Sequence, residues 1–212
     1  MADWNTHLYC AQKVNETLKF EGLEKDMFLF GNLMPDVNAG WLISPKTKID
    51  QPITHFEAIG QGYFWCPHTF YSKYQAEIHK KNPLMLGYLF HLWLDVKIMT
   101  DFVSRVPMSK MLSNGYEVRS YKWKDMSVFI DDKKQCLDAS PENLKKIAEA
   151  TKLISEIDVV EDDLVKVEDF LKKLLNEPSE YQYMIYTEQD FVDFYEKTCD
   201  DFTQWVLNLE NM

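Results

Sequence analysis

Apolar and polar residues alternate along most of this chain with the spacing of amphipathic helices. The pattern predicts helical segments over residues 7–20, 23–33, 70–80, 83–106, 121–137, 140–154, 161–175 and 188–209. The sequence holds only 7 Gly and 8 Pro, few for a β-sandwich or a doubly wound α/β fold. We therefore predict an all-α fold. The aromatic positions of 188–209 are expected to belong to its core.

The most apolar segment, Pro83 to Val106, is predicted to be one long central helix with proline in its first turn. It carries His91 and Asp95, which are four residues apart and so project from the same face. An imidazole and a carboxylate on a buried face have two explanations. Either they hydrogen-bond to each other inside the core, or they hold a metal ion. The spacing alone is more typical of the first.

The elements suggest a single domain over residues 1–212, made of two halves. Residues 1–107 contain every histidine, whereas residues 116–212 form an acidic, helical half. Asn5 or Thr6 is predicted to cap the first helix. Residues 36–54 carry two prolines and are expected to form a long loop, and such loops are often functional.

The composition excludes several classes of protein. Hydrophobic residues make up 46% of the 212 residues, so a folded core is expected. The net charge of −11 argues against binding duplex nucleic acid through a basic face. No glycine-rich nucleotide-binding pattern occurs. A small anionic substrate stays possible, because a metal ion can supply local positive charge.

The four cysteines are widely spaced and contain no Cys-x-x-Cys pair, which argues against a structural zinc ribbon. The first residues are polar and unlike a secretory signal. No apolar stretch is long enough to predict a transmembrane segment. We expect a cytoplasmic protein with reduced, mostly buried thiols.

The candidate chemistry lies in the first half, where all five histidines fall by residue 91. His91 and Asp95 offer two metal donors at helical spacing, and His55 could add a third from a neighbouring element. The remaining candidates are Asp36, as a fourth donor, and His7, which could serve a second ion with Asp95 as the bridge. Taken singly, each residue is more typical of a cap, a turn or a hydrogen-bonded pair. His79 is expected at the surface, whereas His68 could line the cleft.

Four stretches occur in series: Thr6-His7, Gly31 to Asp36, Thr54-His55-Phe56 and Gly87 to Asp95. This series resembles the zinc-dependent phospholipase C family, especially its small bacterial members. The wider superfamily includes the single-strand-specific zinc nucleases. The resemblance covers roughly residues 1–105, and its most specific parts are the Gly-x-x-x-His-x-x-x-Asp pattern and the Pro-Asp loop.

The resemblance implies a helical fold with a multi-zinc cleft that hydrolyses phosphoesters by activating a water molecule. His55, His91 and Asp95 would hold one zinc ion, and Asp36 would ligate it or act as the base. His7 would hold a second zinc ion, with Asp95 shared. Manganese or iron could occupy the same donors. The expected substrate is a small phosphoester: a phospholipid head group, a nucleotide or another phosphodiester.

Two departures from the family qualify this expectation. Secreted relatives use an N-terminal tryptophan as a zinc ligand, whereas Trp4 is internal here. No histidine follows His91, and Asp101 stands where a further histidine would be sought. We therefore expect one or two metal ions rather than three. The alternative is a non-catalytic helical binding or regulatory protein that retains a structural metal site.

Overall fold

The structure is a computed structural model that describes residues 3–38, 43, 48–57, 66–102 and 115–209. Within these residues every regular element is a helix, which confirms the all-α prediction. The elements are α1 (Trp4–Leu18), α2 (Gly22–Gly31), α3 (Met34–Val37), α4 (Gln51–Thr54), α5 (Pro67–His79), α6 (Pro83–Lys97), η1 (Ile98–Phe102), α8 (Gly115–Ile130), η3 (Asp131–Lys133), α9 (Pro141–Thr151), α10 (Glu161–Leu174) and α11 (Glu188–Leu207).

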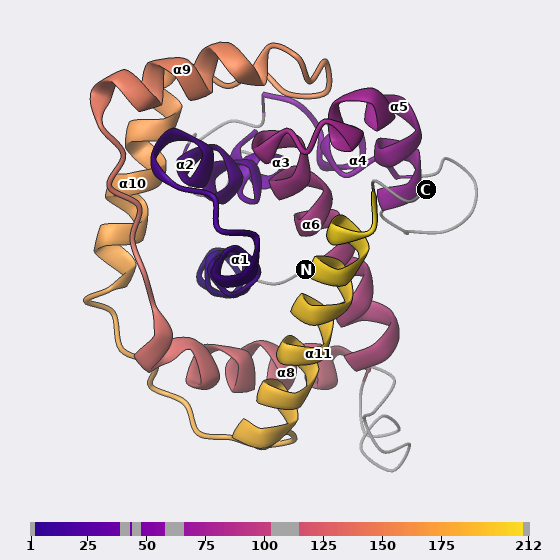
Figure 1. Ribbon diagram of the computed structural model, residues 1–212. Coiled ribbons are helices and arrows are strands. Elements are labelled where there is room, and N and C mark those ends of the chain that lie inside the picture. The colour runs from indigo at the N-terminus through magenta and orange to yellow at the C-terminus, as the bar shows by residue number, and fades with distance from the viewer. Residues whose placement is uncertain (1–2, 39–42, 44–47, 58–65, 103–114, 210–212) are drawn as a thin grey trace.

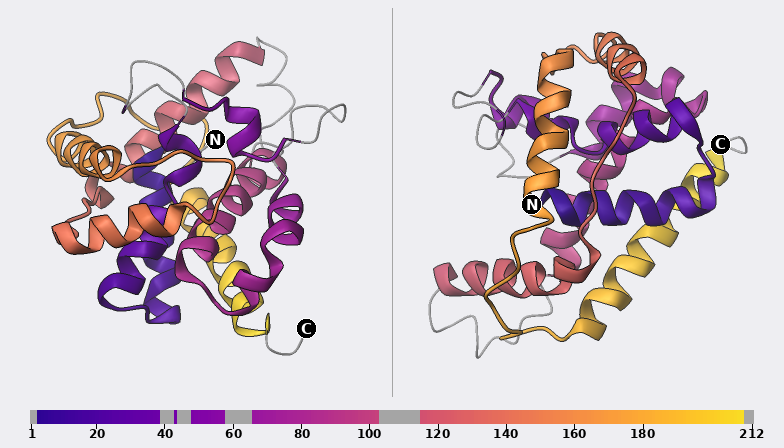
Figure 2. Two further views of the ribbon diagram at one scale, coloured as in Figure 1. Left: turned by 90° about the horizontal axis from the view of Figure 1, so that it is seen from above. Right: turned by 90° about the vertical axis from the view of Figure 1, so that its left-hand side faces the viewer.

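Helix α1 lies in the middle of the molecule, seen end-on in Figure 1 and lengthwise in the right-hand view of Figure 2. It packs against α2, α6, α8 and α11. Its buried face carries Leu8, Ala11 and Val14, all with no exposed surface. One apolar core runs from this helix through both halves of the chain. The aromatic positions of α11, such as Phe191 and Phe202, lie in that core, as predicted.

The start of α1 differs from the prediction. Asp3 caps the helix, because its Oδ1 accepts a hydrogen bond from the backbone N–H of Thr6 at 2.7 Å. Asn5 and Thr6 are inside the helix and buried, so neither is the cap. Aspartate, asparagine and threonine are all good caps, and the sequence pattern does not choose among them. The earlier start places His7 on the buried face of α1.

The backbones of α2 and α6 cross in direct contact, which two glycines permit. A Cβ atom on Gly87 would lie 2.1 Å from the carbonyl oxygen of Phe28, and one on Gly31 would lie 2.4 Å from that of Leu84. Both distances are far below van der Waals contact. The side chain of Asn32 also donates to the carbonyl of Gly87 at 3.2 Å. The crossing therefore holds the end of α2 beside the middle of α6.

Two other predicted segments are corrected. The α-helical part of the central segment ends at Lys97 and continues as the π-helix η1, and residues 103–106 lie outside the described residues. The predicted loop 36–54 contains the short helices α3 and α4, which carry Asp36 and Thr54. Both helices have proline in the first turn, where it costs no helical hydrogen bond.

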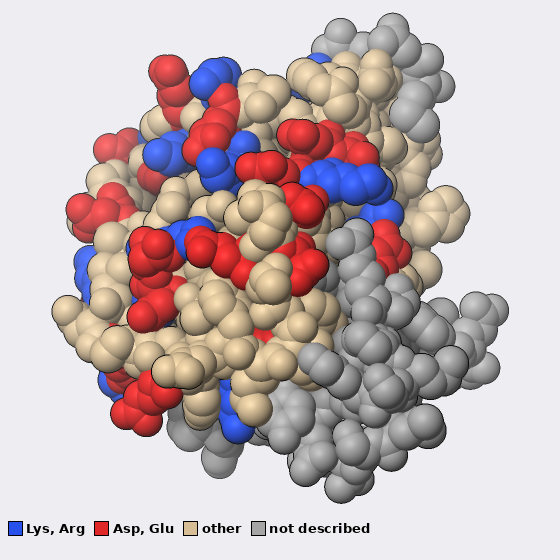
Figure 3. Space-filling view, turned by 90° about the horizontal axis from the view of Figure 1, so that it is seen from below, with Lys and Arg blue, Asp and Glu red and all other residues tan. Residues whose placement is uncertain are grey.

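The acidic half is held by buried carboxylates and covered by mixed charges. Asp125 of α8 accepts hydrogen bonds from three consecutive backbone N–H groups, those of residues 184–186, before α11. On the face shown in Figure 3, acidic side chains are intermixed with basic ones. That face carries no continuous basic surface. Among the described residues, no helix has the length and hydropathy that crossing a membrane requires.

Candidate metal centre

His91 and Asp95 lie one turn apart on α6, as their spacing predicted, and both are fully buried. The Nε2 atom of His91 is 3.6 Å from Oδ2 of Asp95. This distance is too long for a good hydrogen bond. The two side chains therefore lie side by side and point toward a common space, rather than satisfying each other as a closed pair.

His55 and Asp36 reach the same space from α4 and α3. His55 is fully buried, and its Nε2 atom lies 3.2 Å from Nε2 of His91 and 3.9 Å from Oδ2 of Asp95. Oδ1 of Asp36 lies 3.4 Å from the same nitrogen of His55. Four donor atoms from three helical elements thus converge, although 59 positions separate the first from the last residue (95 − 36).

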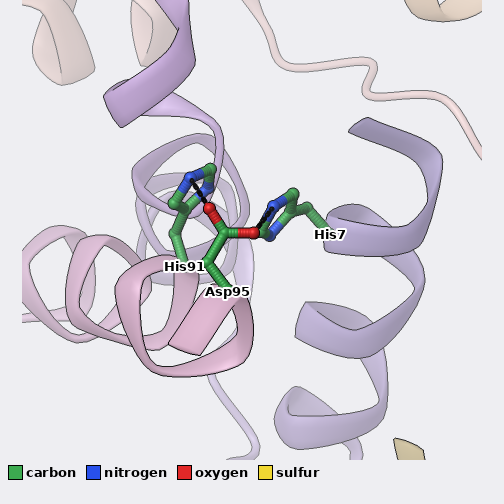
Figure 4. Close-up of side chains that lie close together, drawn as sticks. All are labelled: His7, His91 and Asp95. Atoms are coloured by element: carbon green, nitrogen blue, oxygen red, sulfur yellow. Dashed lines mark ion pairs between the residues drawn. The ribbon is translucent and has the colours of Figure 1, made fainter. Parts of the chain in front are cut away.

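His7 approaches from α1 on the other side of Asp95 (Figure 4). Its Nε2 atom is 3.4 Å from Oδ1 of Asp95, and its ring stacks on that of His91 with the centroids 3.8 Å apart. The two oxygens of Asp95 therefore face different imidazoles. Within the described residues, neither ring nitrogen of the buried His7 has a hydrogen-bond partner. Burying an imidazole without a hydrogen-bond partner costs free energy, unless a ligand binds to its nitrogen atoms.

Hydrogen bonds outside the cluster fix which ring nitrogens can bind an ion. Nδ1 of His91 lies 2.7 Å from the carbonyl oxygen of Asn32, so Nδ1 donates. Burial, reinforced by His7, lowers the pKa of His91 to about 3, so the ring is neutral at pH 7. A neutral ring that carries its proton on Nδ1 presents a lone pair at Nε2. A metal-ligating histidine has the same arrangement.

The ring of His55 is oriented in the same way. The hydroxyl of Thr54 donates to the carbonyl oxygen of Gln51, so it accepts from Nδ1 of His55 at 2.9 Å. The same Nδ1 lies 3.2 Å from the carbonyl oxygen of Gln51. In the neutral ring the Nε2 atom of His55 therefore also presents a lone pair toward the cluster.

The separation of the two Nε2 atoms fits a tetrahedral metal ion. The two Nε2 atoms are 3.2 Å apart, and where both rings carry their proton on Nδ1 the two lone pairs repel each other. Zinc–nitrogen bonds of about 2.0–2.1 Å, meeting at the tetrahedral angle, place two ligand nitrogens about 3.3–3.4 Å apart. A cation between the rings would turn the repulsion into two bonds. The residues present therefore fit a zinc ion.

The two carboxylates are ionised, as metal ligands must be. Burial would raise the pKa of Asp95, but the positive charge around the carboxylate and its contact with His7 outweigh burial and lower the pKa. At Asp36 burial also acts to raise the pKa, and His91, His55 and His7 together lower it. Two anionic carboxylates and three imidazoles, brought together before binding, form a set of donors that a divalent cation prefers.

No protein-family model, curated protein or solved structure matches the chain. Among the described residues, two overlapping groups of side chains could hold a metal ion, His7, His91 and Asp95 in one and Asp36, His55 and His91 in the other. That an ion occupies them stays a prediction.

The structure brings together all five residues that the sequence nominated as ligands: His7, Asp36, His55, His91 and Asp95. Of the other candidates, His68 is exposed at the start of α5, so it does not line the centre. His79 is half-buried and lies 2.8 Å from the hydroxyl of Tyr71. Asp101 is 43% exposed and bonds to Lys97, so it does not replace the missing histidine.

The sequence did not nominate the residues that orient the ligands. Asn32 holds His91 through its backbone carbonyl, which any residue type could supply. Thr54 holds His55 and stands directly before it in the sequence, a signal that could have been read. The thiols were predicted to be reduced and mostly buried. All four are free, but only Cys10 and Cys199 are buried.

Proposed function

We propose that the protein is a metal-dependent hydrolase of phosphoesters, similar to zinc-dependent phospholipase C and holding one or two zinc ions. The observation that carries the proposal is the 3.2 Å separation of the Nε2 atoms of His55 and His91, whose Nδ1 atoms both form hydrogen bonds outside the cluster. The order and spacing of the five donors along the chain support it further. Zinc, with its preference for imidazole and carboxylate, suits the donor set.

The residues would divide the work between two positions. His55, His91 and Oδ2 of Asp95 would hold the first ion, and His7 with Oδ1 of Asp95 would contribute to a second. When bound, the ions supply a Lewis acid that polarises a phosphoryl oxygen and lowers the pKa of a water molecule. The protein supplies the donor set, keeps both carboxylates ionised and fixes the imidazoles.

Asp36 would act as the general base, or as a further ligand. Its side chain is 10% exposed, whereas the side chains of His7, His55 and Asp95 are fully buried. Asp36 is thus the member of the cluster nearest to solvent. Its lowered pKa keeps it ionised at neutral pH, so it can accept a proton from an attacking water molecule.

The substrate would be a small phosphodiester, such as a phospholipid head group or a nucleotide. The net charge of −11 and the mixed charges in Figure 3 argue against an extended polyanion. A single phosphodiester needs positive charge only at its reacting phosphate, and bound metal would provide it.

Metal analysis of protein purified without chelator tests the proposal, with His91→Ala as the comparison. The expected result is one or two zinc ions per wild-type chain and a loss in the variant. A bis-aryl phosphodiester assay with added zinc then measures turnover, with Asp36→Asn as the catalytic variant. Wild-type protein that holds no stoichiometric metal after zinc is supplied would refute the site.

The alternative function is a non-catalytic helical binding or regulatory protein with a structural metal site. The burial of His7, His55, His91 and Asp95 favours it, because structural sites are closed whereas catalytic sites keep a position open. This alternative predicts stoichiometric zinc without turnover of any phosphoester, and the same two measurements separate it from the hydrolase.

A further inference from the structure

The conformation of the chain at His55 requires support from outside α4. His55 itself has φ −97° and ψ 5°, between the helical and extended regions. Phe56, directly after it, has φ +56°, in the left-handed region that bulky residues rarely adopt. Such a conformation persists only where the surrounding structure fixes it. The question is which contacts do so.

Tyr88 is the residue that connects this segment to α6. Its hydroxyl donates a hydrogen bond to the backbone carbonyl of Thr54, the residue before His55. The side chain is fully buried, and its ring stacks on Phe70 with the centroids 4.5 Å apart and the planes within 1°. The ring of Phe56 meets both rings edge-on, at 6.2 Å from Tyr88 and 5.2 Å from Phe70.

Helix α6 therefore acts on the centre in two ways. It carries His91 and Asp95, and one turn before His91 it carries Tyr88 on the same face. The bond from Tyr88 to Thr54 joins α6 to the residue before His55. The rings of Tyr88 and Phe70 contact Phe56, the residue after it. Both contacts thus flank the ligand whose Nε2 atom lies 3.2 Å from that of His91.

We propose that Tyr88 is a positioning residue for the metal ligand His55, acting through its hydroxyl bond to the Thr54 carbonyl. The proposal rests on the proposed function in that His55 is a ligand. It adds a residue that touches neither the ion nor the substrate. Removing the hydroxyl leaves a buried carbonyl without that partner and frees His55 to turn away from His91.

The test compares Tyr88→Phe with Tyr71→Phe. Tyr71→Phe also removes a hydroxyl, whose partners are His79 and Gln75, away from the centre. Zinc affinity is measured by competition with a chelating dye, and the ligand field by the absorption spectrum of the Co²⁺-substituted protein. We expect Tyr88→Phe to weaken zinc binding roughly 10- to 100-fold, the range for loss of an outer-shell partner, and to alter the Co²⁺ spectrum. Tyr71→Phe should change neither.

A second measurement on metal-free protein separates this inference from the function. Nitrogen-15 shifts of the His55 ring report its tautomer, which is fixed in the wild type by Thr54 and Gln51. We expect averaged ring signals in Tyr88→Phe and unchanged signals in Tyr71→Phe. If the wild-type protein binds no metal but the His55 ring signals are averaged in Tyr88→Phe, the proposed function is refuted and the positioning role of Tyr88 is supported.

The positioning role is overturned if Tyr88→Phe keeps both the wild-type zinc affinity and the fixed His55 ring. Thermal unfolding of each variant establishes that the comparison is made on folded protein. Should Tyr88→Phe not fold, Phe70→Leu keeps the hydroxyl and removes only the ring stacked on Tyr88. Because the stacked ring holds the Tyr88 hydroxyl against the Thr54 carbonyl, Phe70→Leu should show a smaller shift of the same sign in both measurements, and no shift in either would also overturn the proposal.

Discussion

Two fully buried aspartates, one in each half of the chain, sit in opposite surroundings. Asp125 faces hydrogen-bond donors: its two oxygens accept from the backbone N–H groups of Met184, Ile185 and Tyr186 at 2.7 to 2.8 Å. Each acceptor meets a donor, so the carboxylate is satisfied by the protein alone. Its role is to hold the segment before α11 against α8.

Asp95 faces imidazole nitrogens instead. Its Oδ2 lies 3.6 Å and 3.9 Å from the Nε2 atoms of His91 and His55. These distances are longer than those of good hydrogen bonds, and a cation between the three side chains would be coordinated by all of them. Both carboxylates are buried aspartates, so what distinguishes the structural one from the proposed ligand is the groups that each one faces. Matched substitutions at the two aspartates test this difference.

The largest contrast is expected from replacing each aspartate by asparagine in metal-free protein. At Asp125 the new amide N–H₂ opposes a backbone N–H, and we expect a loss of about 3–4 kcal/mol in unfolding free energy. At Asp95 the amide can donate to an imidazole lone pair, so stability should stay within about 0.5 kcal/mol of the wild type or rise. Urea unfolding after chelator treatment measures both.

An equal loss of stability in the two variants would show that Asp95 is held like Asp125. The assignment of lone pairs to His55 and His91 would then be wrong. Circular dichroism of each variant before unfolding provides the control, because both should retain the helical spectrum.

Zinc should distinguish the same two variants in the opposite sense. Binding to the native state at 100 times Kd stabilises by about 2.7 kcal/mol, which raises Tm by roughly 5–10 °C for a chain of this size. Asp125→Asn should keep this rise, and Asp95→Asn should lose most of it. Differential scanning fluorimetry with and without zinc measures the shift, with calcium as the control ion. A full rise in Asp95→Asn would remove Asp95 from the ligands.

The sequence predicts the donors of this centre better than the elements that carry them. The four-residue spacing of His91 and Asp95 places both on one face of a helix, and this was confirmed. The first cap was wrong, because Asp3, Asn5 and Thr6 are all competent and only the tertiary structure buries the last two. The role of Asp125 could not be predicted either, because its partners are backbone groups some sixty positions away along the chain.

The convergence of the donors could not be derived from spacing at all. It depends on how closely α2 approaches α6, and that distance is set where Gly31 and Gly87 meet the opposite backbone. A glycine in an apolar helix has many explanations, and only the crossing shows which applies. The resemblance to a family placed Gly87 in a pattern with His91, and the structure supplies a physical reason for that pairing.

Gly87→Ala should move the helix that carries Asp95 without replacing a ligand. The new Cβ would lie 2.1 Å from the backbone of Phe28, so α6 must move away. We expect a loss of about 2 kcal/mol from overpacking, and weaker zinc binding as His91 leaves the carbonyl of Asn32. Gly22→Ala is the control: its Cβ meets nothing within 4 Å, so zinc affinity should not change. Unaltered affinity in Gly87→Ala would disconnect the crossing from the centre.

Acid should affect the centre in a way that isolates His91. Its pKa is lowered from 6.5 to about 3 by burial and by His7, so the unfolded chain takes up a proton at a pH where the native protein does not. Unfolding free energy of metal-free protein should therefore fall as pH drops below 6.5, at no more than about 1.4 kcal/mol per pH unit for this group. Between pH 6.5 and 5 carboxylates titrate little, because their unfolded pKa lies near 4 and the pKa of Asp95 in the native protein is lower still.

In His91→Gln the slope of unfolding free energy against pH in this window should decrease, whereas Asp125→Asn should keep it. An identical slope in His91→Gln would mean that the native ring takes up the proton as readily as the unfolded one, which the buried, neutral ring described here does not allow.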